Sequence, residues 1–203
     1  MSGNRWLQRI AERPDHSQWY VERFRTMAAE GADLDGEARL IDAMAPRGAR
    51  ILDAGCGPGR TGGYLHRCGH TVVGVDLDPV LIAAAEEDHP GPTWLVGDLA
   101  ELDLPARGIP EPFDLIVAAG NVMAFLDPAT RRIVLARLGD HLADDGRAVI
   151  GFGAGRDYPF DEFFEDVAAA GLVVQHRFAT WDLRPFEPDS AFLVAVLARP
   201  AGA

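Results

Sequence analysis

A glycine-rich turn holds the residues of this sequence that are best suited to chemistry. The apolar run that begins at Ile51 contains an acid, Asp53, and three glycines then alternate with other residues at Gly55, Gly57 and Gly59. Glycine tolerates a positive φ and has no Cβ, so a backbone built from it can pass close to a small molecule. A helical pattern follows, and a helix N-terminus offers free N–H groups and the positive end of its dipole. The segment predicts a ligand-binding turn between a buried strand and a helix.

Three acids lie at the ends of successive predicted strands. Asp53 precedes the turn, Asp76 ends the next strand 21 residues after Gly55, and Asp98 follows the third strand. An acid about 20 residues after such a turn accepts the hydroxyls of a ribose. An acid beside the turn suits a cationic amine and repels a pyrophosphate, and the third acid can accept from an adenine amino group. Together the acids predict one ligand with an amine, a ribose and a base.

Alternating strand and helix patterns place this turn in an α/β fold. Residues 46–203 predict a Rossmann-like, doubly wound, mostly parallel seven-stranded sheet. The last two strands have no helix between them, so the last strand should be antiparallel. Residues 1–45 are expected to form an N-terminal helical cap packed on the core, not an independent domain. Beyond the first strand, the expected strands cover 71–76, 93–96, 113–118, 148–152, 172–179 and 192–197, with cap helices over 4–13, 17–30 and 37–44, and a turn over 144–146.

The composition argues against several other classes of function. With 203 residues, 48% of them hydrophobic, the chain should fold as one globular unit. A net charge of −12 argues against nucleic acid or a membrane as a partner. All 19 basic residues are arginine, which excludes Schiff-base enzymes, P-loop nucleotidases and short-chain dehydrogenases that need lysine. Two cysteines are too few for a disulfide framework or a zinc site, and no metal is predicted. Because neither a signal peptide nor an apolar run of about 20 residues is visible, the expected location is the cytoplasm.

In these motifs the sequence resembles the class I S-adenosylmethionine-dependent methyltransferases, over about residues 50–197. Residues 53–59 are similar to the first motif of that family, Val75-Asp76 to its second, and Gly97-Asp98-Leu99 to its adenine-binding turn. Residues 113–121 are similar to its fourth motif. The resemblance implies S-adenosylmethionine as the cofactor and S-adenosylhomocysteine as the product.

The resemblance also implies which residues bind the cofactor. Gly55 and Gly57 would approach its methionine moiety, Asp76 its ribose, and Asp98 with the Leu99 backbone its adenine. The full set of expected cofactor-binding residues is Asp53, Gly55, Cys56, Gly57, Asp76, Leu77, Asp98, Leu99, Ala119 and Asn121, with Tyr20 from the cap.

Catalytic residues are harder to identify, since methyl transfer is an in-line displacement in which alignment supplies much of the acceleration. A general base is needed where the acceptor must lose a proton. His16 is one candidate, because it precedes Trp19 and Tyr20 on the cap, although it also suits a helix-capping or surface role. Asn121 is the other, since the resemblance places it at the methyl-transfer centre.

The substrate side of the site is predicted from two segments. Many enzymes that methylate nucleic-acid amino groups carry Asn/Asp-Pro-Pro-aromatic in the fourth motif, whereas this chain has Gly120-Asn121-Val122-Met123, which argues against that class. An arginine near the ends of strands five and six would suit a carboxylate or phosphate on the substrate. The residues expected at that edge are Arg156, Asp157, Tyr158, Trp181 and Arg184.

The sequence therefore predicts an S-adenosylmethionine-dependent methyltransferase with a small-molecule acceptor, as a monomer or homodimer. One alternative is a NAD-dependent oxidoreductase. Arg60 in place of the third fingerprint glycine, the missing lysine and the antiparallel last strands disfavour it. Another is a non-catalytic module that binds S-adenosylmethionine, which the presence of both Asp76 and Asp98 disfavours.

Overall fold

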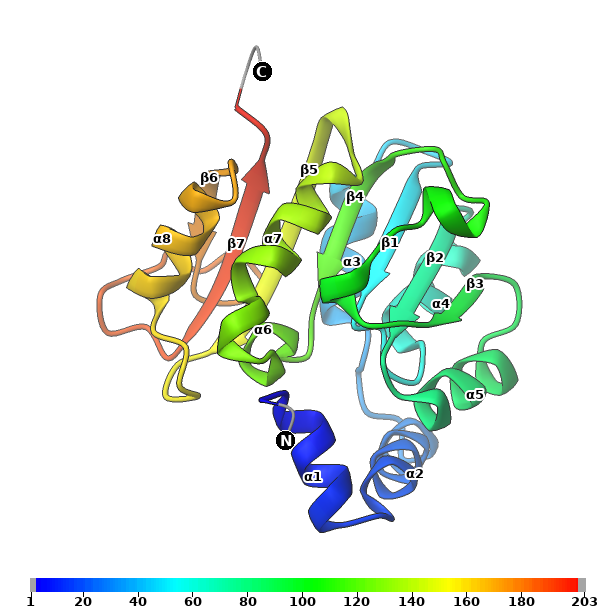
Figure 1. The fold of residues 1–203 in the computed structure, drawn as a ribbon. Coiled ribbons are helices and arrows are strands. Elements are labelled where there is room, and N and C mark those ends of the chain that lie inside the picture. The colour runs from blue at the N-terminus through cyan, green and yellow to red at the C-terminus, as the bar shows by residue number, and fades with distance from the viewer. Residues whose placement is uncertain (1–2, 201–203) are drawn as a thin grey trace.

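A seven-stranded sheet forms the centre of the molecule in a computed structural model that describes residues 3–200 (Figure 1). The strand order is β3-β2-β1-β4-β5-β7-β6, and β7 runs antiparallel to both of its neighbours. This confirms the predicted Rossmann-like sheet with an antiparallel last strand. The strands are β1 (Arg50–Ala54), β2 (Thr71–Asp76), β3 (Thr93–Val96), β4 (Phe113–Ala118), β5 (Leu142–Gly153), β6 (Val173–Phe178) and β7 (Phe192–Ala198).

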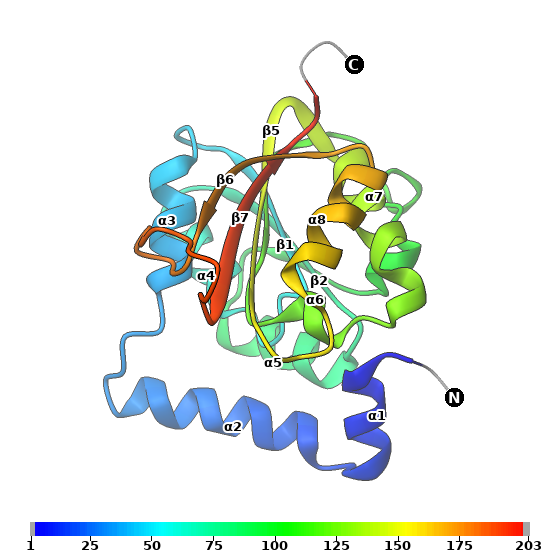
Figure 2. The ribbon, with the colours of Figure 1, turned by 90° about the vertical axis from the view of Figure 1, so that its left-hand side faces the viewer.

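Helices cover both faces of the sheet (Figure 2). On one face α3 (Gly36–Met44) and α4 (Arg60–Arg67) bury Ile41 and Leu65 against Ile51 of β1. On the other face α7 (Arg131–Asp140) and α8 (Phe160–Ala169) bury Leu138 and Phe163 against strand residues such as Ile150. The central strands are therefore buried on both sides, as their continuous apolar runs require.

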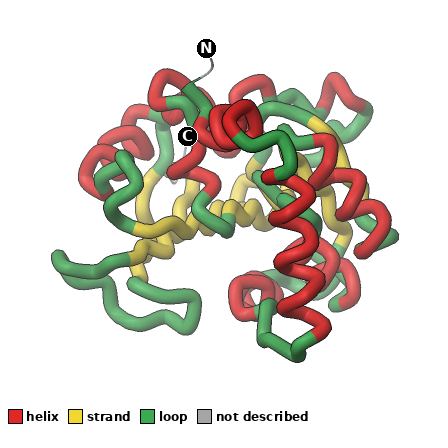
Figure 3. Tube along the Cα trace, turned by 90° about the horizontal axis from the view of Figure 1, so that it is seen from below, coloured by secondary structure: helices red, strands yellow, loops and turns green. Residues whose placement is uncertain are grey.

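The parallel strands end at one edge of the sheet, and α1 (Arg5–Glu12) and α2 (His16–Ala29) lie across that edge (Figures 1 and 3). Asn4 caps the N-terminus of α1, because its side-chain Oδ1 accepts hydrogen bonds from the backbone N–H groups of Trp6 and Leu7 at 3.0 and 3.2 Å. The third helix of the expected cap, α3, instead belongs to the layer on the sheet face. The division of the chain near residue 45 stays a prediction.

Two local features differ from the expectations. Residues 144–146 were expected to form a turn before a strand, but they lie inside β5, which already begins at Leu142. The register of β5 against β4 shifts between Phe113 and Leu115. An irregularity within β5 therefore lies where the turn was expected. A short helix, α6 (Val122–Phe125), follows β4 where no helix was expected.

Four other elements complete the fold. They are α5 (Pro79–Asp88) and the 3-10 turns η1 (Leu99–Glu101), η2 (Pro105–Arg107) and η3 (Pro128–Thr130). No helix among residues 3–200 is long and apolar enough to cross a bilayer.

Candidate active site

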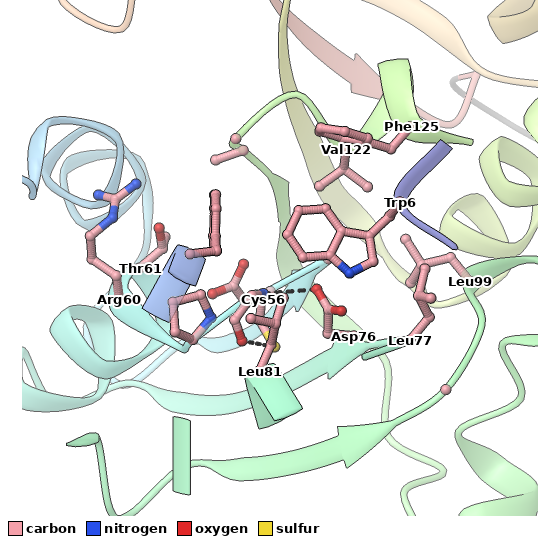
Figure 4. A pocket seen from close by; sticks show the side chains of 18 of the residues that line it. Trp6, Cys56, Arg60, Thr61, Asp76, Leu77, Leu81, Leu99, Val122 and Phe125 are labelled. Carbon is pink, nitrogen blue, oxygen red and sulfur yellow. Dashed lines mark hydrogen bonds between the residues drawn. The ribbon is translucent and has the colours of Figure 1, made fainter. Parts of the chain in front are cut away.

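A cavity lies between the carboxyl edge of the sheet and helices α1 and α2 (Figure 4). Its empty space is about 890 Å³ when the open mouth is included. The floor comes from the glycine turn and from the ends of β2, β3 and β4, the roof comes from α1 and α2, and α6 adds Val122 and Phe125 to the lining. The lining includes Trp6, Tyr20, Phe24, Asp53, Gly55, Cys56, Gly57, Arg60, Asp76, Leu77, Asp98, Leu99, Ala119, Val122 and Phe125.

The three glycines of the turn all have positive φ, but a Cβ would meet different surroundings at each one. At Gly55 it would overlap the side chain of Val122, which begins α6. At Gly59 it would lie 2.7 Å from the Cβ of Ala85. At Gly57 the nearest atom would be Cε1 of Tyr20, 3.9 Å away across the cavity. Gly57 is therefore the glycine that leaves room for a ligand, whereas the other two permit close packing of the protein on itself.

Asp76 at the end of β2 faces the cavity and is held by two backbone N–H groups. Its Oδ2 accepts from Gly57 at 2.9 Å, and its Oδ1 accepts from Asp78 at 3.0 Å. Burial raises the pKa of Asp76 to about 6, against the lowering effect of these hydrogen bonds. The carboxylate thus stands beside the open glycine, where a ribose was predicted.

Asp53 and Asp98 line the same cavity. Asp53 is buried, and its Oδ2 accepts the N–H of Gly62 in α4 at 2.8 Å. Burial raises the pKa of Asp53 to about 7. The Oδ1 of Asp98 accepts the N–H of Ala100 at 2.9 Å and so begins η1. The structure therefore brings the three acids to one cavity, and their assignment to amine, ribose and base stays a prediction.

Most of the other expected cofactor-binding residues also face this cavity, namely Cys56, Leu77, Leu99, Ala119 and Tyr20. Burial raises the pKa of the Cys56 thiol well above its usual value, so the neutral thiol packs as an apolar group. Burial likewise raises the pKa of Tyr20, which keeps its phenol protonated.

The two predicted catalytic residues are not among the described residues that line the cavity. Asn121 has a φ of 68°, and its Oδ1 accepts the N–H of Gly153 at 2.8 Å, which joins the ends of β4 and β5. His16 packs between Trp6 and Trp19, with ring centroids 5.0 and 5.3 Å away. Burial, followed by Arg9 and Arg13, lowers its pKa. A catalytic role for either residue stays a prediction.

The residues expected after β5 and β6 have structural partners. Tyr158 was expected to lie at the carboxyl edge of the sheet, and its side chain is buried in the core. Its hydroxyl donates to Asp166 at 2.9 Å, and the Arg131 guanidinium lies 3.9 Å from its ring centroid. Trp181 packs over Gly151, where a Cβ would overlap the indole.

The charged residues after β5 and after β6 also form polar contacts. Asp157 forms an ion pair with Arg5 of α1, and the Arg156 carbonyl accepts from the same guanidinium. Arg184 pairs with Asp182 at 3.3 Å on the exposed surface.

Several lining residues were not predicted. Trp6 was expected to be an apolar residue of a short helix, and Val122 and Phe125 belong to the unexpected α6. Arg60 donates to Glu37 of α3 at 3.1 and 3.2 Å, and in Figure 4 it lies at the far end of the cavity from Leu99. Helical periodicity marks such residues as buried, but it does not distinguish a cavity wall from a core.

The surroundings suit an adenosine that carries an amino acid. Gly57 leaves space next to the turn, Asp76 presents a carboxylate beside it, and the aromatic rings of Trp6 and Tyr20 stand 5.2 Å apart in the roof. A cavity with apolar walls and a few convergent polar groups is typical of a small-molecule site. The fold and the cavity together define a Rossmann-like protein that binds a nucleoside derivative.

Comparisons with known proteins identify the family. A family model described as a methyltransferase domain matches residues 51–146. A TehB-like S-adenosylmethionine-dependent methyltransferase from Corynebacterium glutamicum ATCC 13032, known from a crystal structure, shares 54% sequence identity with this chain. The two structures match with a TM-score of 0.87, over 92% of this chain and 100% of that chain. The present chain therefore belongs to the class I S-adenosylmethionine-dependent methyltransferases, and its cofactor is S-adenosylmethionine.

More distant relatives act on different acceptors. The magnesium-protoporphyrin O-methyltransferase of Rhodobacter capsulatus is 36% identical over 127 residues, which are 59% of this chain and 53% of that protein. The 18S rRNA (guanine-N(7))-methyltransferase of Mus musculus is 26% identical over 139 residues, which are 63% and 48% of the two chains. The chain thus spans about half the length of these curated relatives. The family excludes the NAD-dependent alternative and leaves the acceptor open.

Proposed function

We propose that this protein transfers the methyl group of S-adenosylmethionine to a small-molecule acceptor by in-line displacement. The observation that carries the proposal is the roof over the cavity. Trp6, Tyr20 and Phe24 of α1 and α2 stand over the carboxyl edge of the sheet and line the cavity from above. An acceptor that reacts beneath this roof has to fit between it and the sheet, which favours a compact molecule.

The residues of the cavity would position and shield the reactants. S-adenosylmethionine supplies a methyl group on a sulfonium, which a nucleophile can accept directly. The backbone at Gly57 and the carboxylates of Asp76 and Asp98 would hold the cofactor. The apolar surfaces of Trp6 and Phe125, which line the cavity, would limit the access of water to the reactants and restrict how an acceptor can lie. Alignment of this kind contributes several kcal/mol in well-oriented reactions, on the order of 7 or more.

The charge of the chain supports a small molecule over RNA. The net charge of −12 repels a phosphate backbone. The cavity lining contains three carboxylates, Asp53, Asp76 and Asp98, against one guanidinium, that of Arg60, which is already paired with Glu37. The relative that acts on 18S rRNA makes RNA the second candidate, and the experiment below includes it. We also propose a cytoplasmic location. For the oligomeric state we propose a monomer or homodimer, and light scattering of the purified chain can test this.

Formation of S-adenosylhomocysteine tests the proposed reaction. The purified protein is incubated with S-adenosylmethionine and, in separate reactions, with a small-molecule ultrafiltrate, total RNA or the protein fraction of a cell extract. We expect S-adenosylhomocysteine above background with the ultrafiltrate. A Gly57→Val variant, whose side chain would enter the cavity, serves as the control that binds no cofactor. Turnover with RNA or protein alone would refute the small-molecule proposal, and tight binding without turnover in any arm would favour the non-catalytic module.

A further inference from the structure

One buried carboxylate outside the predicted cofactor set connects the N-terminal helices to the cofactor edge. Asp78 is 2% exposed and lies two residues after Asp76. Its Oδ2 accepts from Nε1 of Trp6 at 2.8 Å and from Oγ of Ser17 at 2.5 Å. Its Oδ1 accepts the N–H of Val80 at 2.9 Å and so begins α5. Trp6 belongs to α1 and Ser17 to α2, so a single side chain binds both helices of the roof.

The same residue also contacts the cofactor carboxylate. The backbone N–H of Asp78 donates to Oδ1 of Asp76 at 3.0 Å, while Oδ2 of Asp76 accepts from Gly57 at 2.9 Å. A continuous set of hydrogen bonds therefore runs from the roof, through Asp78 and Asp76, to the glycine that borders the open part of the cavity.

The roof is attached to the core by few other buried contacts. Its apolar contacts form a separate cluster that contains four buried residues, Trp6, Val21, Leu81 and Ala84, apart from the two large clusters of the sheet. Arg25 of α2 pairs with Glu87 and Asp88 of α5 at 2.8 Å, but these groups are partly or largely exposed. Segments with small buried areas and exposed ion pairs open locally at lower free energy than a sheet core.

We propose that Asp78 is a positioning residue that couples closure of α1 and α2 to the orientation of Asp76. In the closed state Trp6 and Ser17 satisfy the buried carboxylate, and the backbone at Asp78 holds Asp76 toward the cavity. When the roof opens to admit the cofactor, Asp78 loses both side-chain donors and becomes accessible to water. Because a bound cofactor would contact Asp76 below and the roof above, its binding favours the closed state. The inference rests on cofactor binding, which the family assignment supports, and not on the nature of the acceptor.

Ser17→Ala is the first test, because the serine hydroxyl binds Asp78 and Ser17 is not among the residues that line the cavity. Loss of a hydrogen bond to a charged group should weaken S-adenosylhomocysteine binding about tenfold and raise amide hydrogen exchange in α1 and α2 by a similar factor in the ligand-free protein. Gln18→Ala is the matched control. This side chain is next to Ser17 on α2, is exposed and bonds within the helix to Glu22 at 2.9 Å, so neither measurement should change.

Asp78→Ser is the second test, because serine keeps the helix N-cap but is too short to reach both donors. In that background Ser17→Ala should change the dissociation constant less than twofold, since its partner is already gone. Unchanged exchange and affinity in Ser17→Ala, or effects of the two substitutions that simply add, would overturn the inference. So would faster exchange in β1 and β4 as well as in the roof, because that pattern indicates global destabilisation. None of these measurements requires turnover, so the inference and the proposed acceptor chemistry can fail independently.

Discussion

At the scale of single residues, the glycines of the turn show that one sequence motif performs two physical tasks. Gly57 faces the cavity, whereas Gly55 makes room for Val122. Both have a positive φ, so an L side chain is strained at either position, at a cost of roughly 1–2 kcal/mol. What differs between the two positions is what the new Cβ would meet.

Alanine at each position should therefore give different results. Gly57→Ala places a methyl group in ligand space and should weaken S-adenosylhomocysteine binding at least tenfold, at the conformational cost of about 1–2 kcal/mol in stability. Gly55→Ala adds an overlap with Val122 and should lose a further ~1–3 kcal/mol. Calorimetry and urea unfolding of both variants measure the two effects. An equal loss of stability in both, with equal affinity, would contradict the division of roles.

The pKa of Asp76 predicts how pH acts on the site. Burial raises this pKa from 3.8 to about 6, so the folded protein favours the protonated form more than the unfolded chain does. The contribution of Asp76 to the free energy of unfolding therefore falls as pH rises from 3.8 to about 6, and it is constant above that range. If the ionised carboxylate accepts the ribose hydroxyls, cofactor affinity changes in the opposite direction and increases with pH.

Calorimetric titrations from pH 5 to 8 should show S-adenosylhomocysteine affinity rising by up to about tenfold per pH unit below 6 through Asp76. The affinity should level only above the pKa of Asp53, which burial raises to about 7. Asp76→Asn should bind more weakly and remove the inflection near 6. Asp33→Asn is the control, because Asp33 is an exposed carboxyl whose pKa Arg39 and the Asp35 N–H lower to about 2. Affinity that is independent of pH, or that falls as pH rises, would argue against an ionised Asp76 in the complex.

At the scale of elements, the side chain of Trp94 on β3 packs against α4 and β2 and forms a hydrogen bond at the end of α5. Its indole occupies the space that a Cβ would fill at Gly62 of α4 and at Gly74 of β2. Its Nε1 donates to the carbonyl of His89 at the end of α5, at 2.9 Å. Gly62 and Gly74 thus keep helix and strand close to one large side chain, a role that their spacing in the sequence does not reveal.

This packing predicts a rescue experiment. Gly74→Ala would overlap the indole and should destabilise the protein by about 1–3 kcal/mol. Trp94→Leu should cost about 3 kcal/mol because it removes much of a buried aromatic side chain. In the double variant the new methyl group occupies part of the vacated space, so the combined loss should be smaller than the sum. Urea unfolding of the four proteins checks this, and strict additivity would show that the two positions are not in contact.

At the scale of the whole molecule, the sequence predicted the sheet, and it predicted the edge where Asp53, Asp76 and Asp98 meet. These features follow from local patterns, since apolar strands, helix periodicity and glycine turns are written in consecutive residues. The roof was predicted as a cap, but its attachment was not, because the bonds from Trp6 and Ser17 to Asp78 span 72 and 61 positions in the sequence. The burial of Tyr158 beneath the Arg131 guanidinium could not be deduced from its place after β5 either, because that contact depends on how α7 packs beside the end of β5.

The layout of the molecule predicts what happens when the roof is removed. Helices α1 and α2 contribute to the small cluster around Trp6 and Val21, whereas α3 buries Ile41 in the cluster of the sheet. A chain that begins at residue 31 should therefore retain the sheet and unfold cooperatively, with the Asp78 carboxylate opened to water. Its affinity for S-adenosylhomocysteine should fall at least about a hundredfold, because Trp6, Tyr20 and Phe24 no longer enclose the cavity.

Circular dichroism, urea unfolding and calorimetry on this truncated chain test that expectation, with the full chain as the reference. A second truncation that begins at residue 46 also removes α3, and it should lose cooperative unfolding because Ile51 and Leu115 of the sheet are then uncovered. If both truncations unfold alike, the roof and α3 form one unit, as the predicted division near residue 45 requires. If they differ as expected, the boundary lies between α2 and α3, and the part of the chain that opens for the cofactor ends before Gly36.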